Sequence, residues 1–232
     1  DTSLPPYYFG ESVEIPRKPG IAVELLMILD KKLPQIELSF RRTPWKRCQK
    51  EIKLGRVDGI FPGSFKPERI EIGVFPMHDG QPSSQHSLIN LSYYFYMLKD
   101  SPVLWDGTNM DAVGLIGAPT SYSIVGDLRK RGLNVDDTAR TTEQNLQKLV
   151  MHRIKAVAAQ DVTADPLIKT NSQFIDILKC RPVLSTKANF LIISHQFFEK
   201  HPELTRLIWE NIKLIREQEI ERLSLDYTGK AP

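Results

Sequence analysis

The stretch from Gly55 to Arg69 constrains the fold more than any other part of the sequence. Gly55 can adopt the left-handed conformation that ends a helix, and the apolar run at residues 57–61 then predicts a short buried strand of an α/β sheet. The loop that follows, through Ser64, would lie at the carboxyl end of that strand, where open α/β sheets bind small ligands. Arg69 comes five residues later, and its planar guanidinium suits a carboxylate. The pattern predicts an anion site, and a surface loop with a solvated arginine is the alternative.

Strand and helix patterns alternate along most of the chain. Helices are predicted at residues 21–33, 45–54, from Ser121 or Ser123 to Arg131, and at 142–152, 161–169 and 202–223. Strands are predicted at residues 36–40, 57–61, 88–98, 113–116, 154–159 and 188–194, and residues 78–86 read as a polar loop. This alternation is typical of a parallel α/β sheet.

Two stretches of the sequence, 97 residues apart, have similar patterns. Residues 51–60 and 148–157 each combine a helix end, a one-residue break, an arginine and a buried strand. Chance is an alternative, because helix-to-strand junctions resemble one another. The repeat favours two related α/β lobes, one formed by residues 1–96 plus 187–232 and the other by residues 97–186. The strands at 88–98 and 188–194 would carry the chain between the lobes.

Composition excludes several classes of function. The 232 residues carry a net charge of +3, which is too mild for a nucleic-acid-binding protein. The densest basic cluster, at residues 41–50, is expected to form the solvated side of a helix. No apolar run reaches the roughly 18 residues that span a bilayer. The sequence shows no signal peptide, but we expect the start at Asp1 to be processed or trimmed, so this says little about the compartment.

The sequence predicts neither a metal site nor a cofactor site. Its two cysteines form no CxxC motif and no Cys/His cluster at metal spacing, and it contains no P-loop, no GxGxxG and no Ser-His-Asp order. Cys48 falls on the helix face of Trp45 and Ile52, which favours a buried free thiol. A disulfide between Cys48 and Cys180 is the alternative, although we expect separate thiols.

An ordered set of short motifs runs along nearly the whole chain. They are Leu4-Pro-Pro-Tyr-Tyr-Phe, Pro19-Gly-Ile-Ala-Val-Glu-Leu-Leu, Trp45, Gly-Arg-Val-Asp58, Pro-Glu-Arg69-Ile, Phe75-Pro76, Val113-Gly-Leu-Ile and Thr120-Ser121-Tyr122. This order resembles bacterial extracellular solute-binding proteins of family 3, the polar amino-acid type. The resemblance implies an α/β, two-lobe periplasmic-binding-protein-like fold (type II) with two crossover strands.

The resemblance also implies ligand-binding residues in the first lobe. Arg69 would bind a ligand carboxylate, helped by the Ser64 hydroxyl. Trp45 matches an aromatic residue that packs on the ligand. The remaining positions near the N-terminus are Tyr7 as a second apolar wall, Leu4 where the family often has an aromatic wall, and Asp1, which could reach a ligand side chain.

In the second lobe, Thr120 and Ser121 match the turn that completes carboxylate binding, although Pro119 removes an amide there. Gln160 falls where the family usually has an aspartate for the ligand ammonium, and Asp161 follows one residue later. Asp161 is either a shifted ammonium partner or a helix N-cap. Because Gln160 is neutral, we expect common free α-amino acids to bind weakly.

The resemblance implies a periplasmic solute-binding protein, not an enzyme, that captures a small carboxylate-bearing solute between its lobes. It would deliver the solute to the membrane permease of an ABC transporter, as a monomer and without nucleic acid. One alternative is an extracytoplasmic ligand-sensing domain of a signalling protein. Another is a cyclohexadienyl-dehydratase-like enzyme, for which Asp161, Asp1 and His78 are the few candidate acids or bases.

Overall fold

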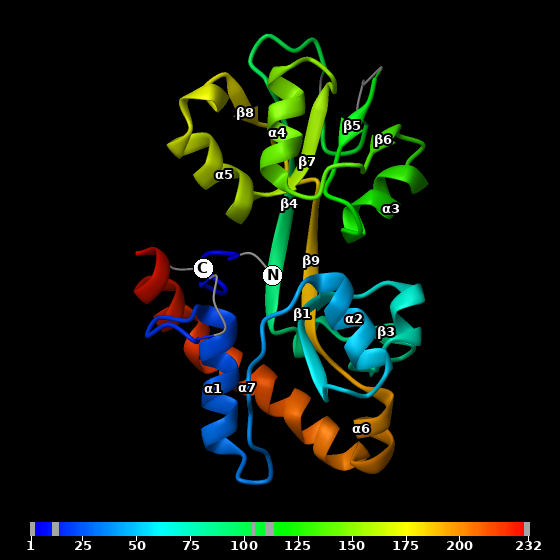
Figure 1. Cartoon of the computed structure of the whole chain (residues 1–232), viewed down its shortest axis with the longest axis vertical. Helices are drawn as coiled ribbons and strands as arrows, with labels where there is room; N and C mark the ends of the chain where they lie inside the picture. The colour runs from blue at the N-terminus through cyan, green and yellow to red at the C-terminus, as the bar shows by residue number, and fades with distance from the viewer. Residues whose placement is uncertain (1–2, 11–13, 104, 110–113, 230–232) are drawn as a thin grey trace. The chain divides into compact units, whose positions relative to one another are not determined.

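The computed structural model describes residues 3–10, 14–103, 105–109 and 114–229, which belong to two compact units. Unit 1 comprises Asp1–Asn90 and Ala188–Pro232, and unit 2 comprises Leu91–Lys187. The chain passes from one unit to the other within strand β4 (Ile89–Leu98) and within strand β9 (Ser185–Ile193) (Figure 1). In the described part of the chain, no helix is both long and apolar enough to cross a membrane.

Unit 1 is built on two helices that come from opposite ends of the sequence. Helix α1 (Ile21–Lys32) lies beside helix α7 (Pro202–Thr228) (Figure 1). The Tyr227 hydroxyl accepts a hydrogen bond from the Gly20 N–H (2.9 Å) and donates one to Glu24. The apolar residues that these helices bury recur at helical spacing: Ile21, Leu25, Leu26 and Leu29 on α1, and Ile208, Ile212 and Ile215 on α7.

The sheet of unit 1 contains strand β1 (Gly59–Ser64), which pairs antiparallel with β9. Helix α2 (Trp45–Lys53) packs on β1 through Ile52, which is fully buried in a core with Ile60 and Phe190. The smaller elements of unit 1 are η1 (Pro67–Glu71), β2 (Met77–His78), β3 (Gln81–Pro82), η2 (Ser84–His86) and α6 (His195–Lys200).

Unit 2 has a mixed sheet covered by helices. Strand β5 (Ile116–Gly117) runs parallel to β6 (Val135–Asp136) and β7 (Ala156–Gln160), while β4 runs antiparallel to β7 and to β8 (Ile177–Lys179). The helices are α3 (Ser123–Lys130), α4 (Thr142–Val150), α5 (Asp161–Thr170) and η3 (Ser172–Phe174).

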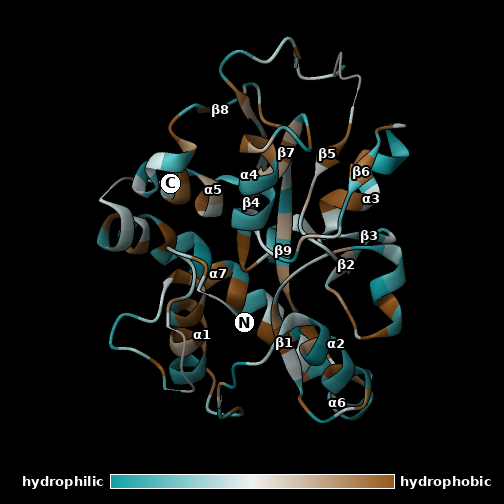
Figure 2. Cartoon of the chain, turned by 45° about the horizontal axis from the view of Figure 1, so that its top comes forward, coloured by the Kyte–Doolittle hydropathy of each residue, from teal (hydrophilic) through white to brown (hydrophobic). Residues whose placement is uncertain are grey.

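Strand β7 is buried on both of its faces, as an inner strand of a covered sheet must be. Ala156 and Ala158 belong to the core that includes Leu128 of α3. Val157 and Ala159 point the other way, into the core that includes Leu149 of α4. Figure 2, in which hydrophobic residues are brown, shows these elements by hydropathy.

The two stretches with similar sequence patterns have the same backbone structure. Helices α2 and α4 are each nine residues long and begin 97 residues apart. After each helix one residue takes a left-handed conformation, Gly55 at φ 65° and His152 at φ 56°. The next residue, Arg56 or Arg153, donates its backbone N–H to the helix carbonyl five residues back, that of Glu51 or Lys148, at 2.9 Å in both cases. Equivalent bonds at equivalent positions support the internal repeat.

Several of the predicted elements need correction. The alternating segment at residues 36–40 is not a strand, because it pairs with no strand in the described part of the chain and its Leu38 N–H binds the Asp30 carboxylate instead (2.7 Å). Strand β1 begins two residues later than expected and continues through Pro62 to Ser64. An irregularity in its pairing with β9, between Ile60 and Gly63, accommodates the proline, which has no N–H.

The sheet is not wholly parallel, since β1, β4, β8 and β9 all have antiparallel partners. The polar loop at residues 78–86 includes the β2–β3 hairpin and η2.

Helix α3 has no side-chain cap: Tyr122 occupies the N-cap position and Ser123 is the first helical residue. The strand predicted at 113–116 is seen at Ile116–Gly117, and Val113 lies outside the described residues.

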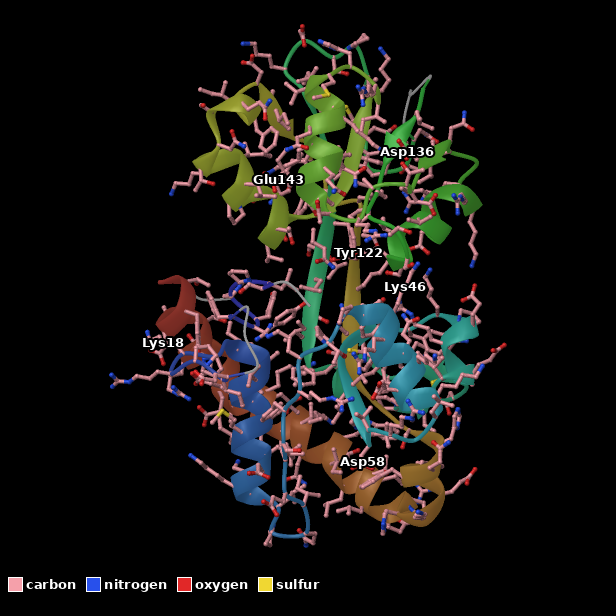
Figure 3. All side chains as sticks on the ribbon, viewed as in Figure 1. Lys18, Lys46, Asp58, Tyr122, Asp136 and Glu143 are labelled. Carbon is pink, nitrogen blue, oxygen red and sulfur yellow. The ribbon has the colours of Figure 1, made fainter. Side chains whose placement is uncertain are left out.

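The basic cluster at residues 41–50 lies only partly on α2: Lys46, Arg47 and Lys50 are on the helix, as expected, whereas Arg41 and Arg42 precede it. Lys46, labelled in Figure 3, and Lys50 are exposed on the helix. Arg41 precedes the helix and, with Arg47, forms an ion pair with the Glu51 carboxylate. The two cysteines are free thiols, as expected, but the Cys48 thiol is only half-buried, close to the Thr43 hydroxyl (3.0 Å).

The helix-to-strand junctions yield a prediction about stability. A left-handed conformation costs a residue other than glycine roughly 1–2 kcal/mol. His152 is exposed, so replacing it by glycine removes this cost and loses no packing. We expect His152→Gly to raise the free energy of unfolding of the protein by about 0.5–1 kcal/mol, after the extra chain entropy of glycine. The reverse change Gly55→Ala should lower it by about 1 kcal/mol or more, because alanine keeps the left-handed conformation and its Cβ would lie 2.8 Å from the Gln196 side chain. Denaturant titration of both variants checks this, and a destabilised His152→Gly protein would contradict it.

Candidate functional site

Arg69 is held at the carboxyl end of strand β1. It lies in the short helix η1, and only 9% of it is exposed to solvent. Its Nη1 donates hydrogen bonds to the Ser64 carbonyl oxygen (2.6 Å) and to the Ser64 hydroxyl (2.9 Å). The predicted spacing of five residues between Ser64 and Arg69 therefore brings the two side chains into direct contact.

Trp45 completes this arrangement in unit 1. The guanidinium carbon of Arg69 lies 5.3 Å from the centroid of the Trp45 ring, within the range of a cation–π interaction. Gly63 makes room for the ring, since a Cβ atom at that position would lie 3.2 Å from Trp45 and 2.5 Å from Ile192. Arg69, Ser64 and Trp45 thus form one group, here called the Arg69 cluster.

The other predicted residues of unit 1 lie in the N-terminal turn. Leu4 is buried, with 7% of its surface exposed, and its backbone pairs with Tyr8, so it is a core residue. The Tyr7 hydroxyl donates to the Asn90 carbonyl oxygen (3.1 Å). Asp1 lies outside the described residues.

In unit 2, the strand ends place the predicted residues at one edge of the sheet. Strands β5 and β7 are parallel, so the turn after β5, with Thr120 and Ser121, and the residues after β7 lie at the same edge. The Thr120 N–H donates to the Ala139 carbonyl oxygen (2.9 Å), and Ser121 takes a left-handed conformation at φ 67°. Ser123, the first residue of α3, is buried, and its hydroxyl has no hydrogen-bond partner within the described residues.

Gln160 and Asp161 follow one another at the end of β7. Gln160 is 7% exposed and donates from Nε2 to the Tyr93 hydroxyl (2.9 Å), which belongs to its partner in the β4–β7 register. Asp161 is the first residue of α5, so it is not the N-cap; Gln160 occupies that position. The Asp161 Oδ1 atom accepts a hydrogen bond from the Val162 N–H (2.9 Å).

Lys179 is a residue of this region that the sequence did not indicate. Its Nζ lies 3.2 Å from Asp161 Oδ2 and 2.8 Å from Asp165 Oδ2, and 4.0 Å from the centroid of the Tyr94 ring. The Tyr96 hydroxyl donates to the other oxygen of Asp165 (2.6 Å). Lys179 is on β8, 18 residues from Asp161, and only the pairing of β8 with β4 brings it near. The available signal in the sequence was the aromatic run at residues 93–96, whose Tyr94 ring lies under the Lys179 ammonium.

The ionisation of this network follows from its contacts. Burial lowers the pKa of Lys179, but the hydrogen bond to Asp165 and the charges of both carboxylates outweigh it, and the net pKa is raised. Burial, together with the bond to Asp165, raises the pKa of Tyr96. Lys179 is therefore a cation and Tyr96 a neutral donor at neutral pH.

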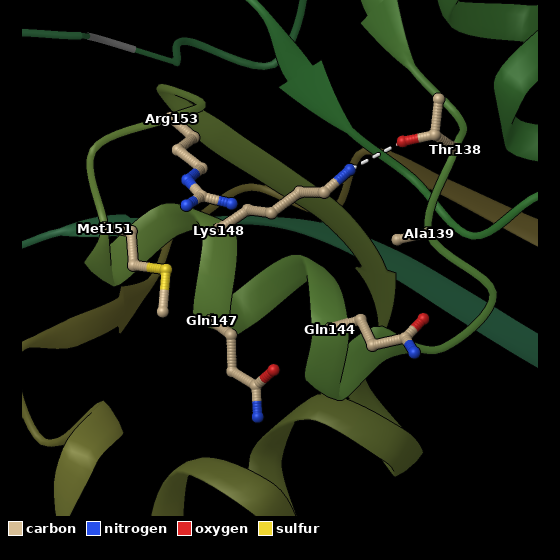
Figure 4. Close-up of a pocket in the computed structure, with 7 residues that line it drawn as sticks. All are labelled: Thr138, Ala139, Gln144, Gln147, Lys148, Met151 and Arg153. Atoms are coloured by element: carbon tan, nitrogen blue, oxygen red, sulfur yellow. Dashed lines mark hydrogen bonds between the residues drawn. The ribbon is translucent and has the colours of Figure 1, made fainter.

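A separate hollow of about 330 Å³ lies elsewhere in unit 2 (Figure 4). It is lined by Thr138, Ala139, Gln144, Gln147, Lys148, Met151 and Arg153, none of which the sequence indicated as a site residue. Lys148 Nζ lies 2.7 Å from the Thr138 hydroxyl and 2.7 Å from Asp136 Oδ2. Burial raises the pKa of Asp136, but the hydrogen bonds from Lys148 and Thr138 prevail and lower that pKa to about 2. Within the described residues, no His, Cys, Asp and Glu side chains are grouped to hold a metal ion.

Comparison with known proteins gives structural matches only. No protein-family model matches the sequence, and no curated protein matches it. Among solved structures, the arginine-, lysine-, histidine-binding protein ArtJ from Geobacillus stearothermophilus matches with a TM-score of 0.71 and 16% identity, covering 100% of this chain and 94% of that one. A lysine complex of a putative ABC-transporter binding component from Wolinella succinogenes matches at 0.71 and 10% identity, covering 99% of this chain and 94% of that one.

This chain has the fold of the substrate-binding proteins of amino-acid ABC transporters. The same fold occurs in a histidine kinase sensor domain with similarity to periplasmic binding proteins, at a TM-score of 0.72 and 17% identity, covering 100% of this chain and 95% of that one. The prediction of a periplasmic-binding-protein-like fold is confirmed. At identities this low, the structural matches establish the fold only. The identity of the ligand has to be inferred from the residues of the site.

The pair of Lys148 and Asp136 yields a prediction about pH. Because the pKa of Asp136 is lowered from 3.8 to about 2, the pair stabilises the folded protein above pH 4 and loses this effect as the pH falls toward 2. In Lys148→Met the pKa of Asp136 should rise, since the burial that opposes ionisation remains. An NMR titration of the Asp136 carboxyl measures it. Lys130→Met removes an exposed lysine of α3 as a control and should leave that pKa unchanged.

Proposed function

We propose that this protein is a solute-binding protein that recognises a small carboxylate-bearing solute through the Arg69 cluster. The observation that carries the proposal is the buried guanidinium of Arg69, which lies against Ser64 and over the Trp45 ring at the end of β1. The end of a sheet strand is where folds of this kind bind ligands. The solved structures with the same fold include the substrate-binding protein of an amino-acid ABC transporter and the arginine-, lysine-, histidine-binding protein ArtJ.

The chemistry of the cluster favours a carboxylate. A guanidinium has five N–H donors in a planar fork, and Arg69 donates two hydrogen bonds to Ser64. A carboxylate can accept two parallel hydrogen bonds from such a fork, and the interaction is strong where water is scarce. Trp45 would add an apolar surface beside the anion. Ser64 holds the guanidinium in place, so little ordering of the side chain would accompany binding.

The class of solute, the residues of unit 2 and the cellular role in this proposal rest on the resemblance to solute-binding proteins. The solute would be amino-acid-like or an organic acid, and Thr120, Ser121, Gln160 and Asp161 of unit 2 would also take part in holding it. Tyr7 and Asp1 would contact its other parts. The protein would act in the periplasm as a monomer, without enzymatic activity, and would pass its solute to the permease of an ABC transporter.

A second candidate function is a ligand-sensing domain of a signalling protein. It is favoured by the histidine kinase sensor domain that shares the fold. The Arg69 cluster would bind the ligand in the same way, but the partner would be a signalling module in place of a permease. Reconstitution with candidate permeases separates the two: stimulation of transport by the loaded protein supports the first function.

The role of Arg69 is tested by substitution. A ligand is first identified by a thermal-shift screen of amino acids, small organic acids and short peptides, because a ligand at 100 times its dissociation constant stabilises by about 2.7 kcal/mol. Arg69→Ala should then lose at least about 30-fold in affinity for that ligand, since removing one partner of a buried charge pair costs 2 kcal/mol or more. Calorimetry measures the loss.

Two further variants make the result specific. Arg69→Lys keeps the charge but loses the planar fork, and should also bind more weakly than the parent. Arg56→Ala removes an exposed arginine of the same unit and should bind like the parent. If a folded Arg69→Ala protein binds the carboxylate ligand as tightly as the parent, the proposed role of the Arg69 cluster is wrong.

A further inference from the structure

The hollow beside helix α4 lies wholly within unit 2, and two cationic side chains line it (Figure 4). The Lys148 ammonium donates to Asp136 and Thr138, which leaves one of its three N–H groups without an acceptor among the described residues. Within the same residues, the Arg153 guanidinium forms no hydrogen bond, ion pair or ring contact. Both side chains therefore have N–H donors available to a bound molecule.

The charges at the hollow favour an anion. Lys148 and Arg153 are positive, and none of the residues that line the hollow is acidic. Asp136 binds Lys148 and is ionised at neutral pH: burial raises its pKa, but the hydrogen bonds from Lys148 and Thr138 prevail and lower it to about 2. Two positive charges and one negative charge leave a net charge of +1 on this group.

The neutral part of the lining also favours an anion. The Oε1 atom of Gln144 accepts hydrogen bonds from the backbone N–H groups of Arg140 and Thr141, so the NH2 group is the polar end of this side chain that is still available. Gln147 adds a second amide. Ala139 and Met151 supply apolar surface. The lining thus combines N–H donors with a small apolar area.

The internal repeat provides a comparison for this hollow. Helices α2 and α4 begin 97 residues apart, and at this offset Lys148 corresponds to Glu51 of unit 1. The Glu51 carboxylate is buried and forms ion pairs with two arginines, Arg41 and Arg47. In unit 1 the chain itself therefore surrounds the central charge with two partners of opposite sign.

In unit 2 the two arginines correspond to shorter, neutral side chains, those of Thr138 and Gln144, and both of these line the hollow. The bond between Thr138 and Lys148 joins the same two positions as an ion pair of unit 1 joins, which supports the correspondence. The central charge is reversed, and Lys148 has only one anionic partner, Asp136, among the described residues. An anionic group from a ligand would supply the second.

We propose that the hollow beside α4 is a binding site for a small organic anion that carries a carboxylate or phosphate group. The anionic group would accept hydrogen bonds from Lys148 and Arg153, and the rest of the ligand would lie against Met151 and Ala139. The planar guanidinium suits either anion. The volume of about 330 Å³ is near the lower end of the range for ligand pockets, which suits a small metabolite. The site belongs to unit 2 alone and is independent of the Arg69 cluster.

The test uses two probes with the same skeleton, glycerate and glycerol 3-phosphate, which distinguish a carboxylate from a phosphate group. NMR titrations of the intact protein follow the backbone amides of Gln147, Lys148 and Arg153. At least one probe should shift these amides in a saturable way, whereas sodium chloride at the same ionic strength should not. The bound probe should also raise the pKa of Asp136, because a second negative charge beside Lys148 disfavours the ionised carboxyl.

Variants assign the binding to the two cations. Arg153→Gln and Lys148→Met should each weaken the binding of that probe by about tenfold or more. Arg153 is exposed and its side chain has no partner within the described residues, so the Arg153→Gln protein should fold like the parent. Lys130→Gln removes an exposed lysine of α3 and should bind like the parent, which controls for a general loss of positive charge.

One more variant separates this site from the proposed solute site. Arg69→Ala changes unit 1 and should leave the amide shifts at α4 unchanged. If neither probe gives saturable shifts at α4 in the parent, or if Arg153→Gln binds the probe as tightly as the parent, the hollow is not a site for such an anion. The proposed role of the Arg69 cluster stands in either case, because it is tested with its own ligand.

Discussion

The sharp reversal from helix into strand is the constraint on which both units depend. At each reversal one residue turns left-handed and the next returns its N–H to the helix, so the strand starts at a fixed distance from the helix end. Both candidate regions lie at the other ends of these strands, Ser64 at the end of β1 and Asp161 just after β7.

The equivalence of the two strand ends extends to their chemistry. Ser64 and Asp161 occupy positions 97 residues apart, and each accepts a hydrogen bond from a cation, Arg69 or Lys179. Each cation also lies over an aromatic ring, Trp45 or Tyr94. The difference is the acceptor, which is a neutral serine hydroxyl for the arginine and an aspartate carboxylate for the lysine.

Sequence patterns predicted the parts of the structure that local forces determine. The helices from Ile21, Trp45, Thr142, Asp161 and Pro202 begin where expected, because apolar spacing and turn residues mark them. The segment at residues 36–40 has the alternation of a strand, but whether it pairs depends on a neighbour that no local pattern reveals. Ser64 and Arg69 were predicted to act together because they are five residues apart. Lys179 was missed because its contact with Asp161 depends on the pairing of distant strands.

The pairing of α1 with α7 affects how the protein can fold while it is synthesised on the ribosome. Unit 2 is one continuous stretch, so every residue of it has been synthesised when Lys187 is added. Unit 1 is different: α1 is made before unit 2, but the helix that packs against it, with the tyrosine that binds Glu24 and Gly20, is made after unit 2. The apolar face of α1 therefore lacks its native partner while unit 2 is synthesised. Domains often complete in the order in which they are synthesised, but here the unit that begins first must be completed second.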